Sequence, residues 1–251
     1  MKPKELKEFL DAKAAQYESR SFIDDDPILI PHHFESKADI EIIGLLAAVI
    51  AWGNRKSIIK SAWRICELLE MNPAQFVSEH QESDLEALPH FVHRTFMRED
   101  LQFFLRALQR IYLDKGGLEK AFHHPEGIKS GIEQWRNWML ETTHAQRSEK
   151  HLASPAKNSA AKRINMYLRW MVRSNSAGVD FGIWSTIKAA DLYCPLDVHS
   201  GRVARKLGLL ERKANDWKAA EELRRNLFNL DSEDPIKYDF ALFGLGVFEK
   251  F

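Results

Sequence analysis

The sequence predicts an all-α fold, and three observations support this prediction. Apolar residues recur at helical spacing along most of the 251-residue chain. Strand-like alternation of apolar and polar residues is almost absent. Residues that begin or break helices, such as Asp39, Gly53 and Pro195, stand between the periodic segments. A series of short helices is therefore expected.

Each expected helix has apolar residues three or four positions apart, which places them on one face. Asp216 and Asp234 precede two of the helices as candidate N-caps, and Pro235 then stands at the favoured first helical position. Residues 142–157 are polar and are expected to form a loop. The expected helices are 6–17, the apolar segment from a cap at Asp39 to Trp52, 55–69, 100–112, 128–140, 159–172, 181–188, 198–207, 216–227 and 235–243.

Length and composition restrict the class of protein. A chain of 251 residues corresponds to one large domain or two small ones. Its longest apolar run, Ile42 to Trp52, is shorter than the roughly 18 residues of a membrane helix, so no membrane span is expected. The N-terminal segment is charged and does not resemble a signal peptide, and Cys66 and Cys194 cannot form a disulfide framework. We therefore expect a cytoplasmic protein without metal or cofactor.

Charge is distributed unevenly along the chain. The 36 basic residues balance the 36 acidic ones, but residues 150–213 carry 12 basic and 4 acidic side chains, a net charge of +8. Such a stretch is either the solvated surface of several helices or a local anion-binding face. The second interpretation is compatible with a neutral chain, because an electrostatic field acts over about one Debye length.

One group of polar residues lies in the segment CPLDVHSGRVARKLGLL, residues 194–210. Asp197 stands where the expected helix begins, and His199, Arg202 and Arg205 follow it. As structural residues, they would be a helix cap and three solvated side chains. As functional residues, they would include a carboxylate that the helix N-terminus holds ionised, which can stabilise positive charge on a substrate.

A second group lies in SAAKRINMYLRWMVR, residues 159–173. Lys162 is in the first turn of the expected helix, with Arg163 and Arg169 close to it in sequence. Neighbouring positive charges disfavour an ammonium ion, so Lys162 is a candidate nucleophilic amine. The alternative is an ordinary surface lysine.

Nearly the whole chain resembles a bacterial family described only as a domain of unknown function. The segments that carry this resemblance are PHHF from Pro31, AWGNR from Ala51, KRINMYLRWMVR from Lys162, GVDFGIW from Gly178, PLDVH from Pro195 and DPIKYDFALFGLG from Asp234.

More remotely, two segments resemble the helix-hairpin-helix (HhH-GPD) DNA glycosylases. PLDVHSGRVARKLGL is similar to the segment that carries their catalytic aspartate, which corresponds to Asp197. AAKRINMYLRWMV is similar to the segment that carries the Schiff-base lysine of archaeal 8-oxoguanine glycosylases, which corresponds to Lys162. SPAKNSAAKR, which has no glycine, stands where those enzymes have a glycine-rich hairpin.

This resemblance implies a multi-helix glycosylase-like fold in a single domain, 1–251, with a cleft between two helical subdomains. One subdomain would comprise about residues 40–155, and the other residues 1–39 with about 156–251. The implied activity is that of a DNA repair glycosylase and AP lyase, an enzyme that removes a damaged base and then cleaves the strand at the abasic (AP) sugar. Lys162 would attack C1′ and Asp197 would stabilise the positive sugar.

The implied partner is damaged duplex DNA, with neither an iron–sulfur cluster nor another cofactor, and the oligomeric state is not predicted. Two alternatives remain: a non-catalytic nucleic-acid-binding protein with the same fold, and a helical protein that binds a nucleoside or other small ligand. The residues expected to contact nucleic acid are Asn54, Arg55, Arg163, Arg169, His199, Arg202 and Arg205, and those expected to stack on a base are Trp170, Phe181 and Trp184.

Overall fold

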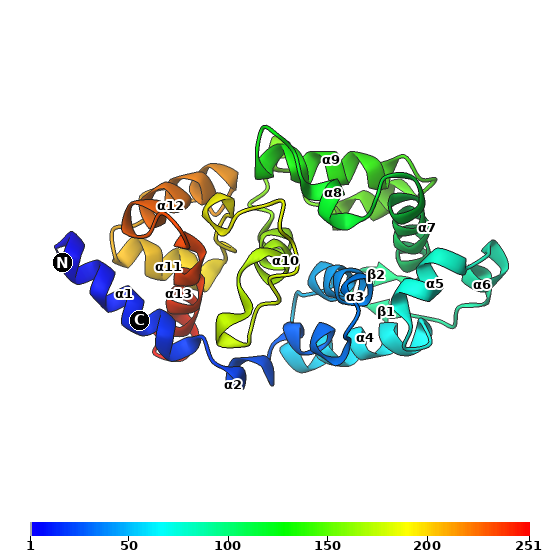
Figure 1. The fold of residues 1–251 in the computed structure, drawn as a ribbon, viewed down its shortest axis with the longest axis horizontal. Coiled ribbons are helices and arrows are strands. Elements are labelled where there is room, and N and C mark those ends of the chain that lie inside the picture. The colour runs from blue at the N-terminus through cyan, green and yellow to red at the C-terminus, as the bar shows by residue number, and fades with distance from the viewer. Residues whose placement is uncertain (1) are drawn as a thin grey trace. The chain divides into compact units, whose positions relative to one another are not determined.

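A computed structural model describes residues 2–251, and almost all of its regular structure is helical (Figure 1). In the described chain, strand structure is confined to a short antiparallel hairpin of β1 (Val92–His93) and β2 (Phe96–Met97). The predicted all-α class is therefore confirmed. The helices are α1 (Pro3–Tyr17), α2 (Arg20–Ile23), α3 (Lys37–Val49), α4 (Arg55–Leu68), α5 (Pro73–Glu79), α6 (Glu82–Ala87), α7 (Arg98–Asp114), α8 (Leu118–Phe122), α9 (Ile128–Leu140), α10 (Lys162–Val172), α11 (Val198–Lys206), α12 (Trp217–Leu230) and α13 (Tyr238–Val247).

The chain divides into two compact units. The first unit comprises the start of the chain up to Asp24 together with Pro155–Phe251, and it contains α1, α2 and α10 to α13. The second unit, Asp25–Ser154, contains α3 to α9 and the hairpin. The division expected from the sequence put the boundaries near residues 39 and 155. Among the described residues, none of the helices combines the length and apolar character needed to cross a bilayer.

Helix α13 is the central apolar element of the first unit, and α1 and α11 both pack against it (Figure 1). Two glycines permit this close approach. A Cβ atom at Gly244 would lie 2.1 Å from the ring of Tyr17 on α1, and one at Gly246 would lie 3.0 Å from Cβ of His199 on α11. The GLG sequence of α13 therefore serves helix packing.

Arg169 on α10 is buried in the first unit and is neutralised from two sides. Its Nε donates to Oδ1 of Asp180 at 3.2 Å, and its Nη1 donates to Oδ2 of Asp239 on α13. The guanidinium also lies over the ring of Phe240, 4.3 Å from the centroid. Removing either carboxylate would leave buried positive charge without its partner, which is costly.

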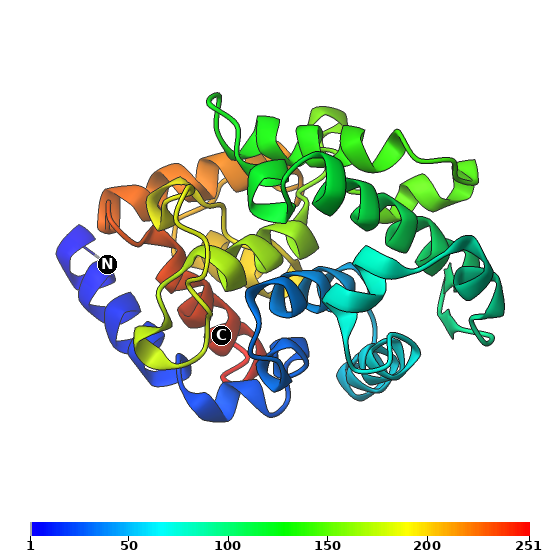
Figure 2. The same ribbon diagram turned by 45° about the vertical axis from the view of Figure 1, so that its right-hand side comes forward.

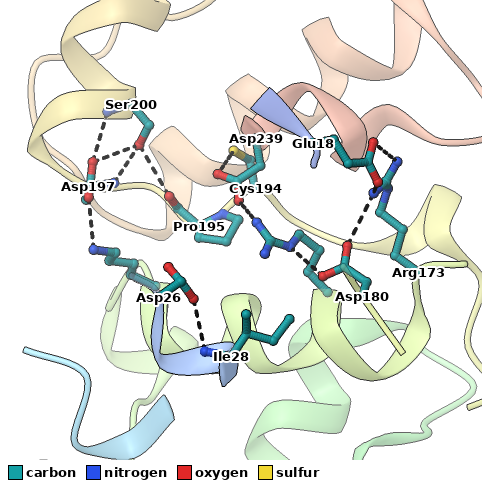
Figure 3. Close-up of polar contacts among 12 residues, drawn as sticks. Glu18, Asp26, Ile28, Arg173, Asp180, Cys194, Pro195, Asp197, Ser200 and Asp239 are labelled. Atoms are coloured by element: carbon teal, nitrogen blue, oxygen red, sulfur yellow. Dashed lines mark hydrogen bonds and ion pairs between the residues drawn. The ribbon is translucent and has the colours of Figure 1, made fainter. Parts of the chain in front are cut away.

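Arg173, which follows α10, continues the same set of contacts. Its guanidinium donates to both oxygens of Glu18, to Asp180 at 3.2 Å and to Asp234 at 2.9 Å. Burial would lower the pKa of Arg173, but the surrounding carboxylates outweigh this effect and raise it. We call these two arginines with Glu18, Asp180, Asp234 and Asp239 the arginine cluster. Figure 3 shows part of it, with Arg173, Glu18, Asp180 and Asp239 labelled.

Several helices begin at positions that differ from those expected. Ser36, rather than Asp39, caps α3: its Oγ accepts a hydrogen bond from the Asp39 backbone N–H. Asp39 is used elsewhere, because its Oδ1 accepts from the backbone N–H of Ala74 at 2.8 Å. The helix expected to begin at residue 159 begins at Lys162, and α13 follows a 3-10 turn at Pro235–Lys237.

Two expected segments differ in kind. Residues 181–188, expected to form a helix, are irregular and run along α10, where the backbone N–H groups of Phe181 and Trp184 donate to Trp170 and Met171. These hydrogen bonds replace the internal bonds of a helix. The expected loop at 142–157 contains 3-10 helices at Gln146–His151 and Pro155–Lys157.

In the second unit, α8 and α9 run beside each other (Figure 2), and the rings of Phe122 and Trp135 stack between them. A buried carboxylate organises another part of this unit. Asp100 on α7 accepts from Arg147 at 2.9 Å, from the Ser148 hydroxyl and from the Met97 backbone N–H. It therefore ties the start of α7 and the end of the hairpin to the segment after α9.

The Asp100 contacts predict a large effect on stability. Burial would raise the pKa of Asp100, but the His151 ring, whose Nε2 lies 3.5 Å from Oδ2, and hydrogen bonds from Ser148 and the Met97 N–H outweigh it and lower the pKa to about 2. We expect Asp100→Ala to lower the free energy of unfolding by about 3 kcal/mol, because it leaves buried donors and charge uncompensated. Urea denaturation at pH 7 would measure this loss.

The matched control is Glu99→Ala, which removes the neighbouring exposed carboxylate and should cost less than about 0.5 kcal/mol. Because the pKa of Asp100 is lowered on folding, its contribution is present above the ordinary aspartate pKa and is lost as the pH falls toward 2. Equal unfolding energies for the two variants would contradict this role of Asp100.

Candidate active site

Lys162 and Asp197, 35 positions apart in sequence, meet in the first unit. Lys162 is the first residue of α10, and Asp197 is the N-cap of α11. The Lys162 Nζ lies 2.9 Å from Oδ2 of Asp197. The side chains are 41% and 18% exposed, so a molecule in solvent can reach both.

The two carboxylate oxygens of Asp197 have different partners. Oδ1 accepts from the backbone N–H groups of His199 and Ser200 at 2.8 and 2.9 Å, while Oδ2 faces Lys162. Burial would raise the pKa of Asp197, but the Lys162 ammonium and the hydrogen bonds from Ser200 outweigh it, so the pKa lies below its usual value. Asp197 is therefore both the helix cap and an ionised group available for chemistry.

A short loop positions Lys162. Ala161 precedes α10 in the left-handed conformation, with φ of 47°, and provides no side-chain cap. The loop is held instead by Asn165, whose Nδ2 donates to the Ala160 carbonyl at 3.0 Å, and by the Ser159 hydroxyl, which accepts from the Ala161 N–H. These bonds fix the point at which the helix begins and hence the origin of the Lys162 side chain.

The segment before α12 links the loop that precedes Lys162 to the turn that carries Asp197. Asn215 donates from Nδ2 to the backbone carbonyl of Asp197 at 2.8 Å, and the next residue, Asp216, accepts from Asn158 at 2.9 Å. Arg205 holds Asn215 in turn, because its Nη2 donates to Oδ1 of Asn215 at 2.7 Å. Sequence reasoning missed Asn215, whose only local signal was its position before the Asp216 cap.

The structure gives different environments to the other residues of the first unit that were expected to bind nucleic acid. The side chains of His199 and Arg202 are exposed, and Arg202 donates to the Gly246 carbonyl at 2.9 Å. Arg163 follows Lys162, and burial lowers its pKa to about 10. Arg169 belongs to the arginine cluster, so its guanidinium is engaged inside the protein.

The aromatic residues expected to stack on a base lie largely in the interior. Trp170 is 0% exposed and Trp184 is 3% exposed, and the Trp184 ring packs edge-on against Tyr167 at 5.5 Å. Phe181 is half-buried. Trp170 lies on α10, and Trp184 lies on the segment that is hydrogen-bonded to the end of that helix, so the burial of both rings reflects packing, which is the usual reason for buried aromatic residues in a helical unit.

Asn54 and Arg55 belong to the second unit. Asn54 caps α4 by accepting from the Ser57 N–H at 3.3 Å, and Arg55 is the first helical residue. The AWGNR motif thus provides a helix start. Across the described residues, no group of three or more His, Cys, Asp or Glu side chains is arranged to hold a metal ion.

Asp197 has two roles that affect stability, capping of α11 and pairing with Lys162, and different substitutions should separate them. Asp197→Ala should lower the free energy of unfolding by about 1 kcal/mol, whereas Asp197→Asn, which keeps a capping oxygen, should cost only a few tenths. The Lys162–Asp197 coupling should stay below about 1 kcal/mol, because the lysine is exposed. Urea denaturation of the single and double variants would measure both.

The pH dependence provides a check on the charge effect. Since the pKa of Asp197 is lowered in the folded protein, the ion pair contributes stability above the ordinary aspartate pKa and loses it as the pH falls through the lowered value. A coupling that does not weaken as the pH is lowered below the ordinary aspartate pKa, or an Asp197→Asn variant as unstable as Asp197→Ala, would contradict this description.

Comparison with known proteins identifies the family. The family model described as "Protein of unknown function (DUF2400)" matches residues 26–248, a range that includes Lys162, Asp197 and Asn215. Searches of the curated proteins and of the solved structures gave no match. The match confirms the predicted membership of a domain-of-unknown-function family, and the chain belongs to the DUF2400 family.

Proposed function

We propose that this protein is a DNA glycosylase and AP lyase in which Lys162 forms a Schiff base with the damaged nucleotide. Asp197 accepts the lysine proton and stabilises positive charge on the sugar. The observation that carries the proposal is the 2.9 Å distance between the Lys162 amine and the Asp197 carboxylate. The two segments that resemble glycosylase motifs are far apart in sequence, and their proposed catalytic groups meet at one solvent-accessible point.

The proposed reaction on an abasic sugar begins at the amine. Asp197 takes a proton from the Lys162 ammonium, and the free amine adds to the C1′ aldehyde. The carbinolamine oxygen receives that proton from Asp197 and leaves as water, which gives the protonated imine and restores the carboxylate. Asp197 then takes the C2′ proton, and the electron pair of the broken C–H bond expels the 3′ phosphate by β-elimination. Water hydrolyses the imine, which releases the sugar as an unsaturated aldehyde and restores the Lys162 ammonium.

The environment of Asp197 suits this role. A lowered pKa keeps the group as a carboxylate at neutral pH, so it can accept a proton and oppose positive charge on the sugar. Two backbone N–H groups hold Oδ1, so the carboxylate keeps Oδ2 directed at the amine without reorganising during the reaction.

The site supports the lyase step more directly than base removal. The rings of Trp170 and Trp184 are packed in the interior, whereas amine chemistry on a sugar aldehyde needs only the exposed Lys162 and Asp197. An abasic site in duplex DNA is therefore the first substrate to test.

Reductive trapping tests the proposal. Incubation of the protein with abasic duplex DNA and sodium cyanoborohydride should give a covalent protein–DNA adduct, because the reagent reduces the imine. Lys162→Ala should abolish the adduct, and Asp197→Asn should slow its formation about 100-fold, the usual scale for loss of a proton-transfer group. Denaturing gel electrophoresis would follow the adduct.

The matched control is Lys188→Ala, which removes another exposed lysine of the first unit and should leave trapping unchanged. An adduct that survives Lys162→Ala would exclude Lys162 as the nucleophile. Salt-dependent binding of the wild-type protein without any adduct would instead favour a non-catalytic nucleic-acid-binding protein.

A further inference from the structure

We propose that Asp239 is a positioning residue for the Lys162–Asp197 pair: it ties the segment before Asp197 to the helix that carries Lys162, and its charge acts on the pair. This inference rests on the proposed function, in which Lys162 and Asp197 are the reacting groups. It concerns a buried side chain on α13 that does not touch the candidate reacting atoms and that the glycosylase resemblance does not identify.

The first connection runs from Asp239 to Asp197. Oδ1 of Asp239 accepts a hydrogen bond from Sγ of Cys194 at 3.4 Å (Figure 3). Only the buried residues Pro195 and Leu196 separate Cys194 from Asp197, and the Pro195 carbonyl lies 3.3 Å from the Ser200 hydroxyl inside the Asp197 cap. A shift of Cys194 would therefore move the capping turn with it.

The second connection runs from Asp239 to Lys162. Oδ2 of Asp239 accepts from Nη1 of Arg169, which lies on α10 with Lys162. Because Arg169 is buried and its other side is held by Asp180, α10 cannot rotate without breaking charged hydrogen bonds. One carboxylate on α13 thus holds both elements whose relative position sets the distance between Lys162 and Asp197.

Charge provides a second, independent argument. The arginine cluster sets four carboxylates against two guanidiniums, so it is acidic overall. The groups that act on Asp239 from neighbouring elements are Arg169 on α10 and Cys194 and Asp197 on the segment that leads into α11. Burial and the Asp197 charge raise the pKa of Asp239, whereas Arg169 opposes them. Because a Coulomb interaction is mutual, negative charge on Asp239 acts on Asp197 in return.

The test measures the reactivity of Lys162 in the absence of DNA. The free protein is methylated with formaldehyde and cyanoborohydride at one fixed pH, and modification of Lys162 is quantified by peptide mass spectrometry. Asp239→Asn keeps the shape of the side chain but removes the charge that holds Arg169. We expect it to change the rate of Lys162 labelling by at least about threefold, because α10 loses a charged anchor and the amine loses its alignment with Asp197.

The matched control is Asp234→Asn, which removes a carboxylate of the same cluster that contacts Arg173 rather than Arg169. It should leave the rate of Lys162 labelling unchanged. Cooperative urea unfolding of both variants would show that they are folded. An unchanged labelling rate in folded Asp239→Asn would overturn the inference.

A second pair of variants tests the connection through Cys194 and also serves if Asp239→Asn does not fold. Cys194→Ala should slow trapping on abasic DNA about tenfold through loss of alignment, and Cys194→Ser, which keeps a donor to Asp239, should restore most of the rate. Equal rates for the two variants would count against the connection. A changed rate of Lys162 labelling in Asp239→Asn, in a protein that forms no DNA adduct, would refute the proposed function and leave the role of Asp239 standing.

Discussion

The first unit depends on the burial of two arginine side chains. A guanidinium removed from water needs hydrogen-bonding carboxylates, since a buried charge that loses its partner destabilises a protein by several kcal/mol. Arg169 and Arg173 obtain all of these partners except Asp180 from segments that are distant in sequence, and α10 is thereby fixed against segments from both ends of the chain. The partners are Glu18 after α1, Asp180 after α10, Asp234 before α13 and Asp239 within it.

These ion pairs reduce the positive charge that the basic residues of 150–213 present to solvent. Residues 150–213 carry a net charge of +8, but carboxylates from outside the stretch form ion pairs with some of its basic side chains. These carboxylates are Glu18, Asp234 and Asp239 in the arginine cluster, and Asp216 beside Arg212. Under the proposed function, attraction to DNA would therefore come from the side chains that remain exposed. In the first unit, the exposed basic residues of this stretch are Lys157, Lys188, Arg202, Lys206 and Lys213.

The local sequence pattern predicted the features that local interactions determine, namely helix positions and some helix caps. Apolar periodicity located nearly every long helix, and Asp216 caps α12 as expected. Tertiary contacts determined the rest. Asp39 accepts a hydrogen bond from the Ala74 N–H instead of capping its own helix, and backbone N–H groups of residues 181–188 donate to the end of α10 instead of forming a helix. Asn215 was not predictable, because its role depends on a hydrogen bond to a residue 18 positions away. Lys162 and Asp197 were identified from motif resemblance, and no periodicity could have given the distance between them.

The structural and functional interpretations of Asp197 do not exclude each other. A capping carboxylate needs one oxygen for the backbone N–H groups of the first turn, and that leaves the second oxygen free to face Lys162. Capping also holds the group ionised, since the helix N-terminus and its N–H donors favour negative charge. A fold that starts a helix with an aspartate beside a lysine therefore creates a fixed carboxylate–amine pair without a dedicated scaffold. What distinguishes a reactive pair from an ordinary ion pair is then its access to solvent and the constraint imposed from behind by Asn215, Cys194 and Asp239.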